Sequence, residues 1–216
     1  LRRTGVPVIV APKRLDALEM AVREHRADVV ISDDGLQHYA LPRSAEIVVL
    51  DGQRMLGNGE CLPAGPLREP GQRLDEVDWV VVNGQPDQPV ADGAVVMPLR
   101  LDDPVTLLTG ERLPIEDFIA RFPLVNAVAG IGNPQRFFAS LQSLGLVVNG
   151  HAFDDHHAFT AQDLAALGSA PVLMTEKDAV KCAEFAAANH WYMPVTAQLP
   201  SVFFDAVFEK LMRSRQ

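Results

Sequence analysis

Two adjacent carboxylates follow an apolar segment near the start of the chain, within residues 32–38 (SDDGLQH). The apolar residues 28–32 are predicted to form a strand, so Asp33 and Asp34 fall at its carboxyl end. Carboxylates in that position can hold Mg²⁺ directly or through water, as the acidic residue of a Walker-B strand does. A simple Asp-Gly turn would explain the same residues without a ligand.

A second group of chemically active residues lies at 153–157 (FDDHH). An imidazole beside a carboxylate can act as a general base, which makes His156 and His157 candidates. Together with His151 the same residues could bind a metal. The alternative interpretation is a loop that leads into a helix starting after Thr160.

The long segment 53–74 is rich in Gly, Pro and Arg and exceeds an ordinary connection. Within it, residues 62–69 (LPAGPLRE) could shape a lid that offers Arg68 to a phosphate and Glu69 to a cation. Solvated surface charge is the alternative interpretation, and it fits Arg73 better than Arg68.

Two glycine-containing patterns bear on phosphate binding. Residues 130–134 (GIGNP) lack the third glycine of a dinucleotide fingerprint and predict a strand-to-helix turn. A P-loop ends in Gly-Lys-Ser/Thr, yet none of the 15 glycines is followed by lysine. Arg14, directly after residues 12–13 (PK), is a further candidate contact for an anion.

Composition narrows the class of protein. The chain has 216 residues, of which 48 % are apolar and 22 % charged, a typical globular balance. Its net charge of −9 argues against a general nucleic-acid surface but leaves room for a local arginine cluster. Cys61 and Cys182 are too few for a disulfide framework or a four-cysteine zinc site, so we expect reduced thiols. No apolar run reaches the ~18 residues of a membrane span.

The elements that would position these residues follow an α/β pattern. Continuous apolar runs are typical of parallel strands covered on both faces, and polar turns after such strands carry the chemistry of α/β proteins. For the first half the pattern predicts a helix at 16–25 and strands at 6–10, 28–32, 46–50 and 78–82. A hairpin is predicted next, from residues 95–101 and 105–108.

The second half repeats the α/β pattern. Strands are predicted at 125–129, 146–148, 172–174 and 191–195. A helix at 135–144 should be capped by Asn133, and capping boxes at 160–163 and 175–178 should open two more helices. An amphipathic helix is predicted at 202–212, with Val202, Phe203, Ala206, Val207, Phe208 and Leu211 facing the core.

Several of these motifs occur together and in order. They are SDDGLQH (32–38), VVLDG (48–52), GNG (57–59), LPAGPLRE (62–69), VVNG (81–84), AGIGNP (129–134) followed by RFF (136–138), DHH (155–157) and MTEKDAVK (174–181). In this combination the chain resembles the tetraacyldisaccharide 4′-kinases, the lipid A 4′-kinases of Gram-negative bacteria. The resemblance covers essentially all 216 residues.

The resemblance implies an α/β fold related to P-loop kinases: a parallel sheet whose N-terminal part is missing, plus a smaller α/β domain joined by a two-stranded linker. The active site would lie in the cleft. The corresponding domains would be a remnant nucleotide-binding domain with a lid loop, a hairpin linker, the smaller domain and a C-terminal helix. Their expected ranges are 1–94 with the lid at 53–74, 95–110, 111–200 and 201–216.

The resemblance also implies an activity. The ATP γ-phosphate would move to the 4′-hydroxyl of a tetraacylated disaccharide 1-phosphate, the lipid A precursor, with Mg²⁺ as cofactor. The enzyme would act peripherally at the cytoplasmic face of the bacterial inner membrane, without nucleic acid.

Site residues carry over one by one from the family's motifs. Asp33 and Asp34 would be the Walker-B-like acidic pair near Mg²⁺. His156 would help activate the 4′-hydroxyl together with a carboxylate. Arg68 and Glu69 would lie on the lid over ATP, with Glu69 a further Mg²⁺ contact.

Arg14 would be a phosphate-side contact. The family's P-loop, its membrane-contacting segment and a Gly-Asp-Glu motif expected to partner His156 precede the position that matches Leu1. The chain is therefore interpreted as the C-terminal two-thirds of the kinase, inactive alone.

Two other functions stay open on the residues alone. One is a truncated, non-catalytic module that binds the lipid disaccharide. The other is a metal hydrolase built on Asp33, Asp34, His156 and His157, which would bind a transition metal tightly.

Overall fold

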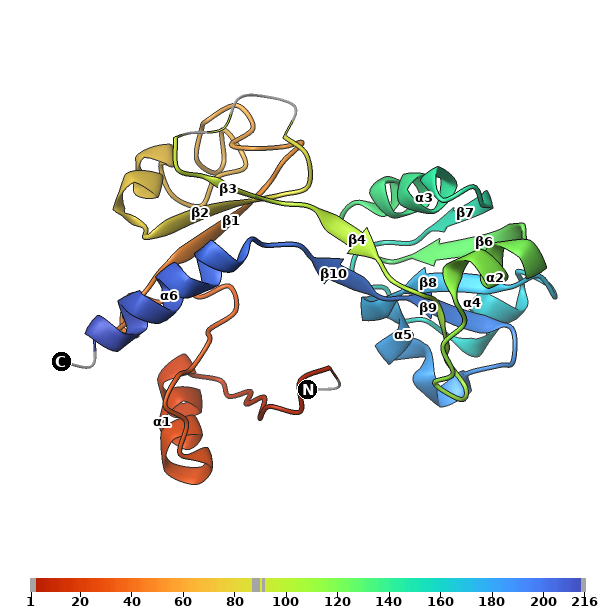
Figure 1. Ribbon diagram of the computed structural model, residues 1–216, viewed down its shortest axis with the longest axis horizontal. Coiled ribbons are helices and arrows are strands. Elements are labelled where there is room, and N and C mark those ends of the chain that lie inside the picture. The colour runs from red at the N-terminus through yellow and green to blue at the C-terminus, as the bar shows by residue number, and fades with distance from the viewer. Residues whose placement is uncertain (1–2, 87–89, 91, 215–216) are drawn as a thin grey trace. The chain divides into compact units, whose positions relative to one another are not determined.

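The computed structural model describes residues 3–86, 90 and 92–214 (Figure 1). It consists of two compact units, the first formed by residues 1–98 and 199–216 and the second by residues 99–198. Residues 1–2, 87–89, 91 and 215–216, which belong to the predicted ranges 1–94 and 201–216, lie outside the described residues.

A three-stranded parallel sheet forms the centre of the first unit. Its strands lie in the order β1 (Ile47–Asp51), β2 (Trp79–Asn83) and β3 (Val95–Met97). Two consecutive residues of β2, Val81 and Val82, are both buried, as expected for a strand covered on both faces. The predicted strands at 46–50 and 78–82 are thus confirmed, and the short helix η1 (Gly71–Glu76) precedes β2.

Helix α1 (Arg14–His25) confirms the helix predicted at 16–25. The strands predicted on either side of it, at 6–10 and 28–32, are wrong: both segments are irregular. Their side chains are largely exposed, with Val10 at 90 % and Ile31 at 92 %. Apolar residues favour a strand only where a neighbouring strand and a packed face receive them, and within the described residues these segments have neither.

The C-terminal helix α6 (Ser201–Arg213) belongs to the first unit. Phe203 packs edge-to-face on Trp79 of β2 with ring centroids 6.0 Å apart, and Lys210 Nζ lies 2.7 Å from the Asp78 carboxylate. Two residues predicted to face the core are instead exposed: Val202 and Phe208. The buried stripe of this helix is narrower than the apolar stripe in its sequence.

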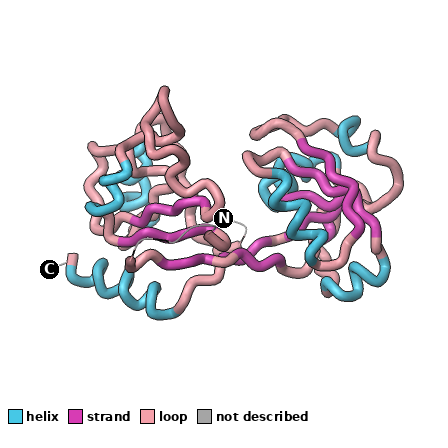
Figure 2. Tube along the Cα trace, turned by 90° about the horizontal axis from the view of Figure 1, so that it is seen from above, coloured by secondary structure: helices cyan, strands magenta, loops and turns pink. Residues whose placement is uncertain are grey.

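The second unit contains a five-stranded sheet, seen from another direction in Figure 2. The strands lie in the order β5 (Val105–Thr106), β9 (His190–Met193), β8 (Val172–Thr175), β6 (Leu124–Ala129) and β7 (Val147–Ala152). All neighbours pair in parallel except β5, which is antiparallel to β9. These strands confirm the runs predicted at 125–129, 146–148 and 172–174, and β7 extends further than expected. The run predicted at 191–195 is divided, since β9 ends at Met193 and Val195 begins β10 (Val195–Ala197).

Helices cover both faces of this sheet. They are α2 (Ile115–Arg121), α3 (Pro134–Ser143), α4 (Ala161–Ala165), α5 (Glu176–Cys182) and the short η2 (Ala183–Phe185). Asn133 caps α3 by accepting a hydrogen bond from the Arg136 backbone, and Thr160 opens α4 with a full capping box, both as predicted. At α5 only half of the predicted capping box forms. The Thr175 hydroxyl accepts the backbone N–H of Asp178, as an N-cap does, and the Asp178 carboxylate accepts a hydrogen bond from the same hydroxyl.

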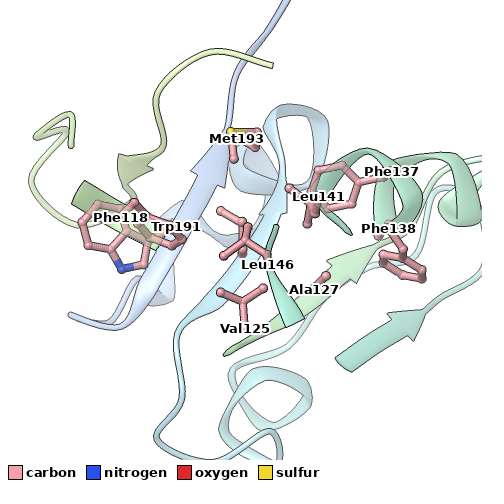
Figure 3. Packing of buried hydrophobic residues seen from close by; sticks show 11 residues of the cluster. Phe118, Val125, Ala127, Phe137, Phe138, Leu141, Leu146, Trp191 and Met193 are labelled. Atoms are coloured by element: carbon pink, nitrogen blue, oxygen red, sulfur yellow. The ribbon is translucent and has the colours of Figure 1, made fainter. Parts of the chain in front are cut away.

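Successive strand residues face two separate hydrophobic clusters. Val125 and Ala127 of β6 pack with the aromatic rings of α2 and α3 on one face (Figure 3). Val128 of the same strand and Met174 of β8 pack on the opposite face with residues of α4 and α5. This alternation explains why the strands are apolar at nearly every position.

The predicted hairpin of residues 95–101 and 105–108 is wrong. Strand β4 (Leu99–Leu101) pairs antiparallel with β10 (Val195–Ala197) instead. Asp102 and Asp103 do not form a tight turn, because the Asp102 carboxylate accepts a hydrogen bond from the Thr196 hydroxyl and Asp103 accepts one from the Ile115 backbone. The two-stranded pair therefore joins segments far apart in the sequence, next to the points where the chain passes between units.

No helix among the described residues is long and apolar enough to cross a membrane.

Candidate functional site

The acidic segment after residue 31 is arranged around Asp34. This residue has a left-handed backbone with φ of 48°, and a Cβ on the next residue, Gly35, would lie 2.6 Å from Ser32 Oγ, so the serine side chain would have to move. Arg68 Nη1 donates to both carboxylate oxygens of Asp34, at 2.8 and 2.9 Å. The turn thus presents the Asp34 carboxylate to the arginine of the 62–69 loop.

Arg14 approaches the same turn from the start of α1. Its Nη1 donates to Ser32 Oγ at 3.3 Å and its Nη2 to the Asp34 carbonyl oxygen at 3.5 Å. Asp33 lies in the same segment with an exposed side chain. Four residues predicted from the sequence are therefore brought together in the first unit: Arg14, Asp33, Asp34 and Arg68.

Glu69 lies beside this group with both carboxylate oxygens engaged. One oxygen accepts a hydrogen bond from the Tyr39 hydroxyl, and the other accepts one from Gln37 Nε2 at 2.5 Å. The Tyr39 hydrogen bond, followed by that of Gln37 and the nearby Arg73 charge, lowers the pKa of Glu69. The same bond raises the pKa of Tyr39. Glu69 is therefore held as a charged acceptor at neutral pH.

The assignment of Arg73 to solvated surface charge is wrong. Its Nη2 lies 2.7 Å from Glu46 Oε2, and each of these side chains is only 17 % exposed. Its Nε lies 3.9 Å from Glu69 Oε1. Sequence reasoning also missed Tyr39 and Gln37 as partners of Glu69, although both lie within or next to the SDDGLQH motif.

The loop that carries Arg68 has a definite local structure. The Leu62 backbone donates to the Leu67 carbonyl at 2.9 Å, and the Leu67 backbone donates to the Glu60 carbonyl at 3.2 Å. A Cβ on Gly65 would lie 2.2 Å from Asn58 Oδ1 and 2.3 Å from the Glu60 carbonyl oxygen. Only glycine fits this close approach, which explains its place in the LPAGPLRE run.

The donor set of the first unit suits Mg²⁺ bound together with phosphates. Such a cation takes one or two carboxylates and completes its shell with phosphate oxygens and water. Asp33 and Asp34 are two exposed carboxylates adjacent in the sequence, and Arg68 binds both oxygens of the second. Groups of three or more His, Cys, Asp or Glu residues that could hold a metal by themselves do not occur among the described residues.

The second unit carries its own polar group in the loop after β7. His156 has a left-handed φ of 63°, and its backbone N–H donates to Asp155 Oδ1 at 3.0 Å. The other Asp155 oxygen lies 3.7 Å from His156 Nε2. Lys177 Nζ lies 3.1 Å from Asp155 Oδ1, and this hydrogen bond, aided by the His156 charge, lowers the pKa of Asp155. The exposed imidazole of His156 therefore lies beside a charged carboxylate.

The neighbouring histidines have other partners. His157 packs against Phe153 and, edge-on, against Phe159, with ring centroids 4.7 and 4.8 Å away, and its Nε2 lies 3.3 Å from Asp163 Oδ2. His151 Nε2 lies 3.1 Å from Asn126 Oδ1. The structure thus separates His151, His156 and His157 rather than gathering them around a shared metal.

A buried carboxylate lies close to this loop. Asp178 has no exposed surface, and its Oδ2 accepts hydrogen bonds from the Gly130 backbone at 3.0 Å and the Thr175 hydroxyl at 2.7 Å. Its Oδ1 lies 2.9 Å from Lys181 Nζ. Residues 130–134 form the predicted strand-to-helix turn. The Asp178 carboxylate holds the first residue of this turn through the hydrogen bond from the Gly130 backbone.

In the second unit the polar side chains follow strands of a parallel sheet, as in α/β proteins that bind ligands, whereas in the first unit Asp33 and Asp34 follow an irregular segment. The family model described as "LpxK: Tetraacyldisaccharide-1-P 4'-kinase" matches residues 1–213. The chain therefore belongs to the tetraacyldisaccharide 4′-kinase family, as its motifs predicted.

Curated relatives agree with the family match. A tetraacyldisaccharide 4′-kinase of Alcanivorax borkumensis is 54 % identical over 211 residues, covering 98 % of this chain and 63 % of the relative. That of Methylobacillus flagellatus is 48 % identical over 214 residues, covering 99 % of this chain and 63 % of the relative. The chain thus spans less than two thirds of the length of these relatives.

A solved structure supports the fold. It is described as the "apo" form of LpxK from Aquifex aeolicus in complex with ATP, and it matches with a TM-score of 0.67 at 24 % identity. The match covers 93 % of this chain and 62 % of that one. The predicted α/β fold class is thereby confirmed.

Proposed function

We propose that the protein to which this chain belongs transfers the γ-phosphate of ATP to the 4′-hydroxyl of a tetraacyldisaccharide 1-phosphate. The observation that carries the proposal is the family match over residues 1–213. The high identity to relatives named tetraacyldisaccharide 4′-kinase supports it, as does the ATP complex of the solved relative from Aquifex aeolicus.

In the first unit, we assign Asp33 and Asp34 to Mg²⁺. When bound, Mg²⁺ would neutralise charge on the phosphate oxygens. Arg68 would contact phosphate, because the anion it now binds is an exposed carboxylate that a phosphate could replace. Arg14 would act on the same side from α1. Glu69 is the further Mg²⁺ contact of this proposal, although Tyr39 and Gln37 already use both of its oxygens.

In the second unit, we assign His156 to the acceptor hydroxyl. An imidazole titrates near neutral pH, so it can accept a proton from the attacking hydroxyl. The Asp155 carboxylate, whose Oδ2 lies 3.7 Å from His156 Nε2, would orient the ring for this step. Positioning and charge neutralisation should supply most of the rate, since phosphoryl transfer asks little covalent chemistry of the protein.

The 216-residue chain by itself should not turn over ATP at a normal rate, because its sequence contains no Gly-x-x-x-x-Gly-Lys-Ser/Thr to wrap the phosphates. We further propose that the enzyme acts peripherally at the cytoplasmic face of the inner membrane. The amphipathic character of a tetraacylated acceptor supports this placement.

A transfer assay tests the proposal. The complete open reading frame that encodes this chain is expressed and incubated with Mg²⁺, ATP labelled with ³²P at the γ position, and tetraacyldisaccharide 1-phosphate. We expect label in the extracted glycolipid, and none with an acceptor whose 4′-hydroxyl is blocked. Absence of transfer to the unblocked acceptor would overturn the proposal, and normal turnover by the 216-residue chain would overturn its predicted inactivity.

A further inference from the structure

Asp178 is a buried charge with three well-defined donors. Burying a carboxylate is unfavourable unless it is hydrogen-bonded and paired, and here the Gly130 backbone, the Thr175 hydroxyl and the Lys181 ammonium satisfy it. Gly130 directly follows β6, whereas Thr175 ends β8 and caps α5. The carboxylate of Asp178 therefore ties the turn after one strand to the start of the helix after the neighbouring strand.

The preceding residue, Lys177, reaches a third loop. Its Nζ lies 3.1 Å from Asp155 Oδ1 in the loop after β7. Strand β6 pairs in parallel with both β7 and β8, so the three loops leave the same edge of the sheet. Two consecutive residues at the start of α5 thus connect all three loops.

Asp155 completes the connection to His156. The oxygen that binds Lys177 also accepts the backbone N–H of His156 at 3.0 Å, which supports the left-handed backbone there. The second oxygen is left facing the imidazole, 3.7 Å from Nε2. Lys177 therefore determines which oxygen of Asp155 the imidazole meets.

We propose that Lys177 and Asp178 are positioning residues for His156. Asp178 fixes the start of α5 against the turn after β6, and Lys177 then holds Asp155, which orients His156. Neither residue needs to touch the substrate. The inference rests on the proposed role of His156 in phosphoryl transfer, but the physical link between these residues can be measured without any turnover.

The link is tested by titrating the Asp155 carboxyl group with carbon-detected NMR in the 216-residue chain. Lys177→Met should raise the pKa of Asp155, because the hydrogen bond that contributes most to its low value is removed. Asp178→Asn should raise it as well, although Asp178 does not contact Asp155. Removal of the negative charge alone would have the opposite sign and lower that pKa, so a rise reports displacement of Lys177.

Lys181→Met is the matched control. It removes a partner of Asp178 on the same helix but leaves the hydrogen bonds to Gly130 and Thr175, so the pKa of Asp155 should stay at its wild-type value. If Asp178→Asn does not fold, Thr175→Val removes the hydroxyl that donates to the Asp178 carboxylate and caps α5, leaves the Gly130 hydrogen bond in place, and should raise the same pKa. An unchanged Asp155 titration in Lys177→Met, or a lowered pKa in Asp178→Asn, would overturn the proposal.

Kinetics of the complete open reading frame separate this inference from the proposed function. Lys177→Met should lower kcat about 10- to 100-fold through misplacement of His156, with KM for ATP unchanged. Lys177→Arg, which keeps a cation, should restore part of the rate. A wild-type kcat in Lys177→Met would overturn the positioning role. If Asp155 responds in NMR as expected but the wild-type protein transfers no phosphate, the proposed function fails and the link between the loops stands.

Discussion

Replacing Arg68 by methionine separates function from stability in the first unit. The Arg68 and Asp34 side chains are 59 % and 66 % exposed, and a single nitrogen, Nη1, makes both short contacts. Exposed ion pairs of this kind contribute about 0–1 kcal/mol to folding. For a chain of this size, that corresponds to a shift in melting temperature of at most about 4 °C.

The expected effect on the reaction is much larger. If Arg68 binds phosphate, the loss of its guanidinium should lower kcat/KM for ATP about 100- to 1000-fold, the range typical of a charged group that stabilises developing charge. Calorimetry of the 216-residue chain measures stability, and the transfer assay on the complete open reading frame measures kcat/KM.

Arg100→Met is the matched control, because Arg100 is also an exposed arginine paired with an aspartate, Asp102, at 3.2 Å. It should change neither quantity appreciably. The reasoning would be refuted if Arg68→Met left kcat/KM at the wild-type value, or if it cost more than about 2 kcal/mol of stability, since the pair would then be structural.

Three further predictions concern local structure. Gly65→Ala places a Cβ 2.3 Å from the Glu60 carbonyl oxygen, so residues 53–74 should be cut faster in limited proteolysis while the fragments of the second unit keep their protection. Tyr39→Phe removes the bond that most lowers the pKa of Glu69. Above the ordinary carboxyl pKa of about 4.3, the Tyr39→Phe protein should therefore be less stable than the wild type by the full contribution of this bond. The difference in stability should disappear as pH falls through the folded pKa of Glu69, and acid titration by circular dichroism can follow it. Burial raises the pKa of Cys182 to about 11, so at pH 8 a thiol reagent should label this residue only after unfolding, as mass spectrometry would detect.

The strands of the second unit could be predicted because they are short apolar runs that end in turns. The same pattern failed at residues 6–10 and 28–32, where the chain is irregular and exposed. Hydrophobic periodicity identifies a segment that can be buried, but it does not identify the partner that buries it. Where the described residues supply no neighbouring strand, an apolar run by itself does not form a strand.

The hairpin failed for a related reason. Local sequence suggested that residues 95–101 should pair with the next apolar run, yet β4 pairs with β10, which lies almost a hundred residues later. Helix caps were more predictable, since Asn133 and Thr160 bind backbone groups within three residues of themselves.

In the candidate site, too, the sequence identified some residues but not the contacts that depend on the fold. The motifs singled out Asp34 and Arg68 for separate roles, a Mg²⁺ ligand and a phosphate contact, and did not predict the ion pair that the structure shows between them. Tyr39 could not be identified as a partner of Glu69, because a lone tyrosine carries no spacing signal. Asp178 was interpreted as a capping residue, and its contact with Gly130 depends on strand order, which the sequence does not reveal.

The role of His156 in phosphoryl transfer is tested by the single-turnover rate of the complete open reading frame, compared between wild type and His156→Ala at saturating ATP and acceptor. We expect the rate to fall about 100- to 10,000-fold, as for loss of a general base, while the Kd for ATP stays the same. A His156→Ala protein that transfers phosphate at the wild-type rate would contradict this role.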